Sequence, residues 1–119
     1  MSSTASVTAR CTAALSTRAD TSAALREACE SARESLGGTP DLALMFFSAS
    51  HAGSADRLAA EACDLLGTGQ VLGCGAESIV GTGREVEGEP AFSLWLARWP
   101  GANITPMHLQ FERTPEGCP

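Results

Sequence analysis

The chain has 119 residues, a length that suits one domain with a hydrophobic core of its own. Its eight basic residues are all arginines, spread singly along the sequence, and 14 acidic residues bring the formal net charge to −6. A net negative chain without a basic cluster is a poor candidate for binding nucleic acid or an anionic membrane surface. We therefore expect neither as a partner.

Hydrophobicity and cysteine content indicate a soluble protein of the cytoplasm. No apolar run approaches the roughly 20 residues that a transmembrane helix requires, and the longest, 42–47, has the length of a strand. The cysteines are odd in number and lack a C-x-x-C pair, which argues against a disulfide framework or a zinc site; they are Cys11, Cys29, Cys63, Cys74 and Cys118. Free thiols are the simplest interpretation, and we expect no cofactor.

The sequence predicts a disordered amino terminus at 1–8, a folded domain at 9–111 and a carboxyl-terminal tail at 112–119. The first nineteen residues contain two arginines but no acidic residue, a composition shared with organelle transit peptides. The span Val7 to Leu15 also suits a short strand. Targeting to an organelle therefore stays open as an alternative to a cytoplasmic location.

The first strongly periodic segment predicts a helix from Asp20 to Leu36. Its apolar side chains recur on one helical face, at Leu25, Ala28, Cys29, Ala32 and Leu36. Asp20 or Thr21 is placed to cap the first turn, and Gly37 and Gly38 supply the left-handed residue that ends the helix.

A strand, a helix and a second strand follow, separated by short polar loops. The run 42–47 is apolar at every position, which predicts a central strand covered on both faces. The loop 48–53 leads to a helix that Ser54 caps and that ends at about Leu66, before Gly67. Residues 70–74 form the next apolar strand. This succession is typical of a βαβ unit, in which the two strands are parallel.

Three more strands are predicted at 79–86, 91–99 and 104–111, with turns at 87–90 and 100–102. Pro106 lacks a backbone donor, so the last strand should lie at a sheet edge or carry a bulge. The predicted fold is therefore mixed α/β: a βαβ unit followed by an antiparallel β-meander, with helices packed on a mixed sheet.

Polar residues follow both strands of the βαβ unit. Because the carboxyl ends of parallel strands meet at one edge of a sheet, the two loops that follow them should lie side by side. We expect the amino end of the second helix, whose first amide groups lack partners, to join them and to favour an anion. The candidate ligand-binding residues are Ser48, Ser50, His51, Cys74, Glu77 and Ser78. In the alternative interpretation the serines only cap the helix and His51 only faces solvent.

Catalytic interpretations of these residues are weak. Cys74 beside His51 suggests a thiol nucleophile with its base, but a nucleophile elbow has glycine two places before and after the nucleophile, where this chain has Leu72 and Ala76. The pattern that begins at Gly73 departs from the dinucleotide fingerprint and is followed by a strand in place of a helix. Alternate glutamates at 85, 87 and 89 are typical of a solvated hairpin. We therefore expect that the protein is not an enzyme.

The stretch 72–87, Leu-Gly-Cys-Gly-Ala-Glu-Ser-Ile-Val-Gly-Thr-Gly-Arg-Glu-Val-Glu, resembles the amino-terminal part of the FIST domain, which is shared by F-box and intracellular signal-transduction proteins. The apolar strand 42–48 precedes it and 91–96 follows it at the family's spacing. The likeness covers roughly residues 9–110. It implies a cytoplasmic sensory domain that binds a small ligand, with amino acids suggested, and that has no established catalytic centre.

The resemblance also implies particular residues and partners. The positions that match the family motif are Gly73, Cys74, Glu77, Gly81, Gly83, Arg84 and Glu85, with Ser48 and His51 in the loop after the first strand. Family proteins usually continue into a longer carboxyl-terminal FIST half, which is not found in this sequence. We therefore expect either a stand-alone or truncated version, or a partner that completes the sensor, which would be that half or another signalling protein.

Three hypotheses follow. In the first, Arg84 binds a ligand carboxylate through two parallel hydrogen bonds; alternatively, Arg84 pairs with Glu85 or Glu87 across a hairpin. In the second, the protein is an interaction module without a small ligand that buries a sheet edge near Trp95 and Trp99 against a partner. In the third, Cys74 is a redox switch near a helix amino end, where the pKa of a thiol falls.

Overall fold

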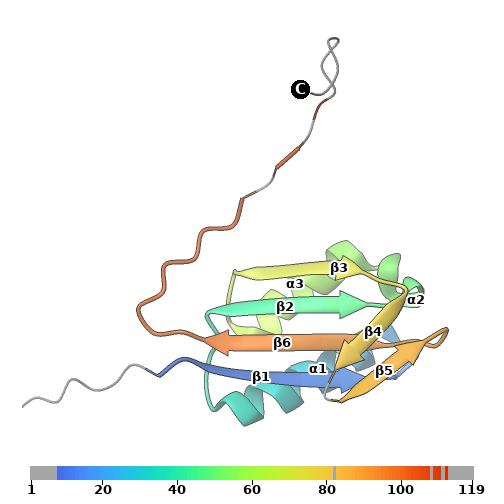
Figure 1. The fold of residues 1–119 in the computed structure, drawn as a ribbon, viewed down its shortest axis with the longest axis horizontal. Helices are drawn as coiled ribbons and strands as arrows, with labels where there is room; N and C mark the ends of the chain where they lie inside the picture. The colour runs from blue at the N-terminus through green and yellow to red at the C-terminus, as the bar shows by residue number, and fades with distance from the viewer. Residues whose placement is uncertain (1–7, 82, 108, 111, 113–119) are drawn as a thin grey trace, which may run out of the picture.

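The structure is a computed structural model that describes residues 8–81, 83–107, 109, 110 and 112. Its elements are β1 (Arg10–Ser16), α1 (Thr21–Leu36), β2 (Leu42–Phe47), α2 (Ala49–Ala52), α3 (Ala55–Leu66), β3 (Val71–Gly75), β4 (Ser78–Gly81), β5 (Arg84–Glu87) and β6 (Phe92–Arg98). A four-stranded sheet has the order β1-β6-β2-β3, and β4 and β5 form a separate two-stranded sheet (Figure 1). Strand β6 is antiparallel to both of its neighbours, whereas β2 and β3 are parallel.

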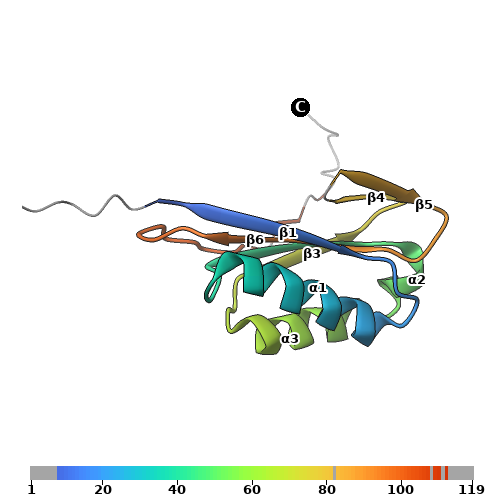
Figure 2. The same ribbon diagram turned by 90° about the horizontal axis from the view of Figure 1, so that it is seen from below.

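The molecule has a layer of helices on one face of the four-stranded sheet. Helices α1 and α3 cover this face, and the β4-β5 hairpin lies over one end of the opposite face (Figure 2). The hydrophobic core lies between the sheet and the helices, and its largest fully buried apolar side chains include Leu25, Leu36, Met45, Leu58, Leu66, Phe92, Leu94 and Leu96. The predicted mixed α/β fold, with helices packed on a mixed sheet, is confirmed.

Helix α1 has the caps that its sequence predicts. The Asp20 carboxylate accepts a hydrogen bond of 2.9 Å from the backbone N–H of Ala23, which satisfies one of the unpaired amides of the first turn. Gly37 follows the helix with φ of 79°, a left-handed conformation that favours glycine, and its N–H donates to the Arg33 carbonyl at 3.0 Å. The predicted apolar face is buried against the sheet.

Strands β2 and β3 with helix α3 between them confirm the predicted βαβ unit. The loop after β2 contains one difference, because its residues 49–52 form the single helical turn α2. Ser54 occupies the first cap position of α3 but its side chain makes no cap hydrogen bond, so that detail of the prediction is wrong. No helix in the described part of the chain is both long and apolar enough to cross a membrane.

Strand β2 is central in the sheet, as predicted, but the helices cover only one of its faces. Ala43, Met45 and Phe47 are buried in the core, whereas Phe46 points the opposite way and is 39% exposed. The prediction that both faces of this strand are covered is therefore wrong.

The segment 79–86, predicted as one strand, is instead the tight hairpin of β4 and β5. The hairpin is held on the sheet by a hydrogen bond of 2.9 Å from the Ser93 hydroxyl of β6 to the Val80 carbonyl. Gly81 makes this close approach possible, because a β-carbon there would lie 3.0 Å from the Ser93 Oγ and 3.2 Å from the Leu15 Cβ. A small second cluster of Ile79, Val86 and Ala91 is buried beneath the hairpin.

The ends of the chain agree only partly with the predictions. The expected strand at 7–15 is β1, although Val7 lies outside the described residues, and the expected strand at 91–99 is β6. Residues 104–107, 109 and 110 do not form the predicted last strand, and 108 and 111 lie outside the described residues. Pro106 has no backbone N–H, so this segment lacks one donor for a strand ladder. The two edge strands of the sheet, β1 and β3, are each paired on one side only.

Candidate functional site

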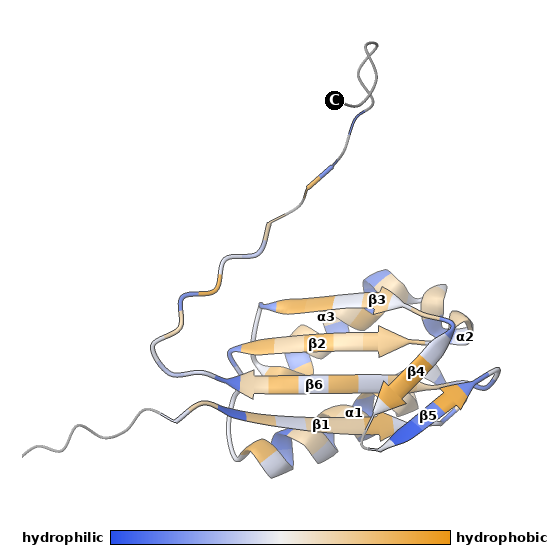
Figure 3. Ribbon diagram, viewed as in Figure 1, coloured by the Kyte–Doolittle hydropathy of each residue, from blue (hydrophilic) through white to orange (hydrophobic). Residues whose placement is uncertain are grey.

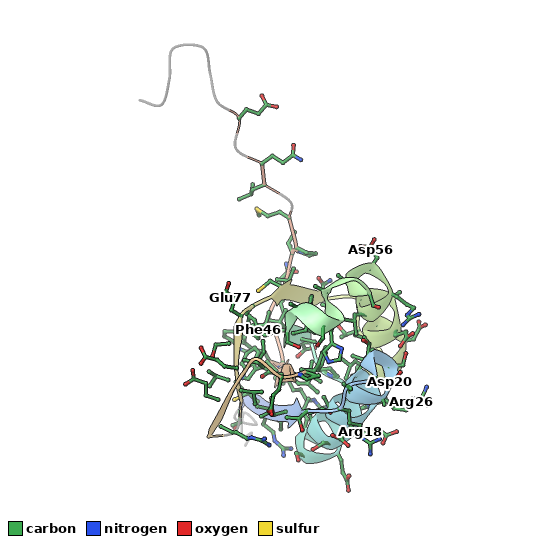
Figure 4. The ribbon with its side chains drawn as sticks, turned by 90° about the vertical axis from the view of Figure 1, so that its right-hand side faces the viewer. Arg18, Asp20, Arg26, Phe46, Asp56 and Glu77 are labelled. Carbon is green, nitrogen blue, oxygen red and sulfur yellow. The ribbon has the colours of Figure 1, made fainter. Side chains whose placement is uncertain are left out.

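A hollow of about 430 Å³ opens at the carboxyl ends of β2 and β3. Three chain segments meet there, one after β2, one after β3 and one after β5. Figure 4 views the domain from this end and shows Glu77 well away from Arg18 and Arg26, which lie on the side of α1. The lining residues are Ser48, Ala49, Ser50, Ala76, Glu77, Gly88, Glu89 and Pro90. The predicted meeting of the loops that follow the two parallel strands is therefore seen in the structure.

Ser48 fixes the floor of the hollow. Its backbone N–H donates to the Ala91 carbonyl at 3.0 Å, and its side-chain oxygen accepts a 3.0 Å hydrogen bond from the Ala91 N–H. The Ser48 and Ser50 hydroxyl oxygens are 2.9 Å apart and share a further hydrogen bond. Because Ser48 is only 8% exposed, it holds the segment before β6 against the end of β2, and Ser50 carries the more accessible hydroxyl.

The charged side chains that line the hollow are both acidic. Glu77 follows β3 and Glu89 follows β5, and both residues are exposed. The backbone N–H of the neighbouring Ala76 donates to the Phe47 carbonyl at 2.9 Å, which fixes the start of the Glu77 loop against β2. The electrostatic character of the hollow therefore favours a positively charged group over an anion.

His51 lies apart from the hollow and does not face solvent. It belongs to α2 and is fully buried, and its Nδ1 is 2.7 Å from the hydroxyl oxygen of Thr21 at the start of α1. Its Nε2 has no hydrogen-bond partner among the residues that the structure describes. His51 thus packs on the helical side of the sheet and is not among the residues that line the hollow. The alternative prediction, a solvent-exposed His51 side chain, is wrong.

The candidate residues of β3 also lie outside the lining. Gly73 faces the core side, where a β-carbon would lie 2.9 Å from the terminal methyl group of Met45. Cys74 is exposed on the opposite face of the sheet. Because Cys74 and His51 lie on opposite sides of the sheet, the structure does not assemble the pair that a thiol nucleophile with a histidine base would need.

The candidate residues of the hairpin interact within the hairpin or with solvent. The Ser78 hydroxyl donates to the Glu85 carboxylate at 2.9 Å across β4 and β5. Arg84 is exposed opposite Gly81 at the turn. Within the described residues, Arg84 makes no ion pair with Glu85 or Glu87, so the predicted cross-hairpin pair is absent there.

The amino end of α3 forms a second, separate hollow of about 310 Å³, lined by residues 52–57. The turn of α2 lies between this helix end and β2, so the helix does not point its free amides into the hollow beside Ser50. Asp56 in the first turn of α3 already places a carboxylate beside these amides. The amino end of α3 therefore does not contribute to the candidate site beside Ser48 and Ser50.

Sequence reasoning missed the third wall of the hollow, residues 88–90. The sequence predicts a turn at 87–90 and places Glu89 on a solvated face. The signal that could have placed it is the return of the chain through Ala91 into β6, because β6 lies next to β2 and brings the preceding turn to the end of that strand.

The cysteines within the described residues differ strongly in exposure. Cys11 and Cys74 are exposed, Cys63 is half-buried and Cys29 is buried in the core. Burial raises the pKa of the Cys29 thiol from 9.0 to about 12, and the nearby charge of Glu30 acts in the same direction. Cys29 is thus a packing residue with an inert thiol.

The rate of alkylation should distinguish the exposed cysteines from the buried one. At about pH 8 an alkylating reagent should modify Cys11 and Cys74 readily and leave Cys29 unmodified until the chain unfolds. The unfolded thiol ionises near pH 9.0 and the folded one near 12, so the stability that Cys29 contributes is complete below pH 9 and is lost as the pH rises toward 12. In urea unfolding, the stability difference between the chain and Cys29→Ala should shrink above pH 9; a constant or growing difference contradicts the assignment.

Fold and site together define a two-layer mixed α/β domain whose loops form a hollow at the carboxyl ends of two parallel strands. The sequence matches the FIST N domain over residues 41–106, and the chain belongs to this family. The family resemblance found in the sequence is thereby confirmed.

Curated proteins similar to the chain come from mycobacteria. The uncharacterized protein Rv0628c of Mycobacterium tuberculosis is 41% identical over 105 residues, which cover 87% of this chain and 27% of that protein. The uncharacterized protein Mb0898c of Mycobacterium bovis is 33% identical over 103 residues, 86% of this chain and 26% of that protein. The chain therefore spans about a quarter of the length of these relatives. No solved structure matches it significantly.

Proposed function

We propose that this FIST N domain is a non-enzymatic sensory module that binds a small molecule in the hollow between the ends of β2 and β3 and the turn 88–90. The observation that carries the proposal is the convergence of three separate segments on one hollow of about 430 Å³. This volume is in the range of small-molecule sites, and loops at the carboxyl ends of parallel strands are the usual place for them.

The charges of the lining point to an ammonium group on the ligand. Glu77 and Glu89 are acidic, Ser50 offers a hydroxyl, and Arg84 lies outside the lining. A ligand carboxylate held by Arg84 therefore has no support from the geometry, whereas an amine can form charge-assisted hydrogen bonds with the two carboxylates. An amino acid remains a suitable ligand, bound through its amino group.

The path from ligand to output would begin at the turn 88–90. A ligand that contacts both Glu77 and Glu89 would tie the loop after β3 to this turn. The turn leads through Ala91, which is hydrogen-bonded to Ser48, into the central strand β6. Binding would thus order the segments around the hollow and stabilise the folded state, because only the folded state contains the site.

The test is thermal unfolding of the chain with three matched ligand sets: free amino acids, their methyl esters and their N-acetyl derivatives. The esters keep the ammonium group, and the N-acetyl compounds keep only the carboxylate. A ligand at about 100 times its Kd stabilises the native state by about 2.7 kcal/mol, a shift of several degrees in Tm for a domain of this size. We expect at least one amino acid and its ester to raise Tm, and its N-acetyl derivative to leave Tm unchanged.

Two variants locate the site. Glu77→Gln and Glu89→Gln should each abolish most of the ligand-induced shift while leaving the Tm of the free chain nearly unchanged, because both side chains are exposed. Glu34→Gln on α1 is the matched control and should keep the full shift. A shift that survives both site variants, or one produced by N-acetyl compounds instead of amines, would refute the proposed site.

A further inference from the structure

The four-stranded sheet has a second face on which apolar side chains lie uncovered. Along β1, β2, β3 and β6, the positions that alternate with the core residues point away from α1 and α3. We call this surface the open face; its principal residues are Cys11, Leu44, Phe46, Leu72, Cys74 and Trp95. The positions of these four strands on the open face carry no charged side chain. Figure 3 shows that β2 is hydrophobic along its length and that β3 is hydrophobic over much of its length.

The open face is unusually apolar for a surface in contact with water. Phe46 is 39% exposed, Leu72 52% and Trp99, just after β6, 53%. A small apolar hollow of about 160 Å³ beside Cys11, Trp95 and Trp99 adds a recess into which a side chain of another element would fit. Contiguous apolar patches of this kind mark interaction surfaces. The hairpin covers only one end of the face (Figure 2).

The length of the related proteins and the direction in which this chain leaves the domain indicate which polypeptide covers the open face. In the mycobacterial relatives about three quarters of the protein lies outside the part that this chain matches. Beyond β6 the described residues of this chain leave the domain on the hairpin side of the sheet (Figures 2 and 4). Met107 and Leu109 in this segment are more than 70% exposed. A polypeptide connected here reaches the open face without passing around the helices.

A second copy of the chain fits the face less well. Each copy carries a net charge of −6, so two copies repel one another. The hairpin also projects from the open face, and two flat sheets could meet only if both hairpins avoided the facing sheet (Figure 2). These two features disfavour a symmetric dimer through this surface.

We propose that the open face is the docking surface for the polypeptide that forms the remainder of the longer FIST proteins, and that this polypeptide presents an uncharged, apolar face of its own. Leu72 and Trp95 lie in register with Leu44 across the middle of the sheet and form the centre of the contact, together with the neighbouring Phe46. Trp99 forms a second anchor at the opposite end of the sheet from the ligand hollow. This inference does not depend on the ligand proposed above.

The test uses the cysteines of the chain as reporters. A chimera is made in which this chain replaces the 105 matched residues of Rv0628c, and alkylation of each cysteine is followed by peptide mass spectrometry. We expect Cys74 and Cys11 to react at least about tenfold more slowly in the chimera than in the isolated chain, because docking excludes the reagent. Cys63 on α3 is the internal control and should react at the same rate in both.

A second format avoids dependence on the folding of the chimera. The remainder of Rv0628c is added as a separate polypeptide to the isolated chain and to Leu72→Glu, which places a charge in the centre of the face at an exposed position. Slower Cys74 alkylation in the unaltered chain but not in Leu72→Glu supports the docking surface. Unchanged Cys74 rates in both formats would overturn it. The proposal would also be overturned if the alkylation rate of Cys74 fell as the concentration of the isolated chain alone was raised, because the face would then be covered by a second copy.

Discussion

Phe47→Ala should lower the free energy of unfolding by about 3–5 kcal/mol, whereas Phe46→Ala should lower it by about 1 kcal/mol or less. The two residues are consecutive in β2 and have the same side chain, but Phe47 is 5% exposed in the core and Phe46 is 39% exposed on the open face. Removing the Phe47 ring leaves a cavity between sheet and helices. Removing the Phe46 ring leaves no enclosed cavity, because this side chain already lies at the surface.

Urea unfolding of the isolated chain and of both variants measures this contrast, with equal m-values as the check that the folded and unfolded states are comparable. Equal losses of stability in the two variants would mean that both faces of β2 are covered in solution. That result would contradict the one-sided core. In a protein where the open face is docked, the cost of Phe46→Ala should rise toward that of Phe47→Ala.

Gly81→Val is expected to destabilise the chain by about 1–3 kcal/mol, because the close contact between the hairpin and the sheet leaves no room for a side chain. A β-carbon at this position would lie 3.0 Å from the Ser93 Oγ and 3.2 Å from the Leu15 Cβ. The hairpin would have to lift, which breaks the hydrogen bond from Ser93 to Val80 and displaces the turn 88–90 that follows β5. Ligand-induced stabilisation should therefore be lost along with part of the stability.

Gly69→Val is the matched control, since nothing lies within 4 Å of a β-carbon at Gly69 and its φ is not in the left-handed region. Its stability should change by no more than about 0.5 kcal/mol. Thermal unfolding of both variants, with and without ligand, provides the comparison. A Gly81→Val variant as stable as Gly69→Val would show that the hairpin is not packed on β6.

Local sequence was sufficient to predict the elements whose stability depends on near neighbours. Helix α1 was bounded by Asp20 and Gly37, because a cap and a left-handed glycine act within one turn of the helix end. The βαβ unit followed from two apolar runs separated by a helix of suitable length. Long-range pairing was harder: nothing near 92–98 in the sequence indicates that this strand inserts between β1 and β2.

The apolar run 42–47 was interpreted wrongly for a physical reason. An uninterrupted apolar strand indicates that both faces are buried in the complete assembly, but it does not say which polypeptide covers each face. In this chain the helices cover one face, and in our docking proposal the remainder of the longer FIST proteins covers the other. The hairpin at 79–86 was missed because its two short strands and turn together have the length and apolar content of a single strand.

The candidate site was predicted in part. The positions of Ser48, Ser50 and Glu77 around one hollow follow from the parallel pairing of β2 and β3. His51 could not be placed because the turn of α2 rotates its side chain toward α1, and a single helical turn has no reliable sequence signature. Glu89 required knowledge of where β6 lies, since only the sheet order brings its turn to the hollow.

The position of β6 also determines when the domain can form during synthesis. Of the strands in the described sheet this one is synthesised last, yet it is the one that joins β1 to the rest of the sheet, with Arg10 paired to Arg98. Until β6 is available, β1 has no strand to pair with and the core lacks Phe92, Leu94 and Leu96. Pairing between segments so distant in sequence is slow, because the entropy of closing the long intervening loop is lost before the stabilising contacts form. The nascent domain thus exposes its apolar strands until β6 has been synthesised and then completes its sheet in one late step.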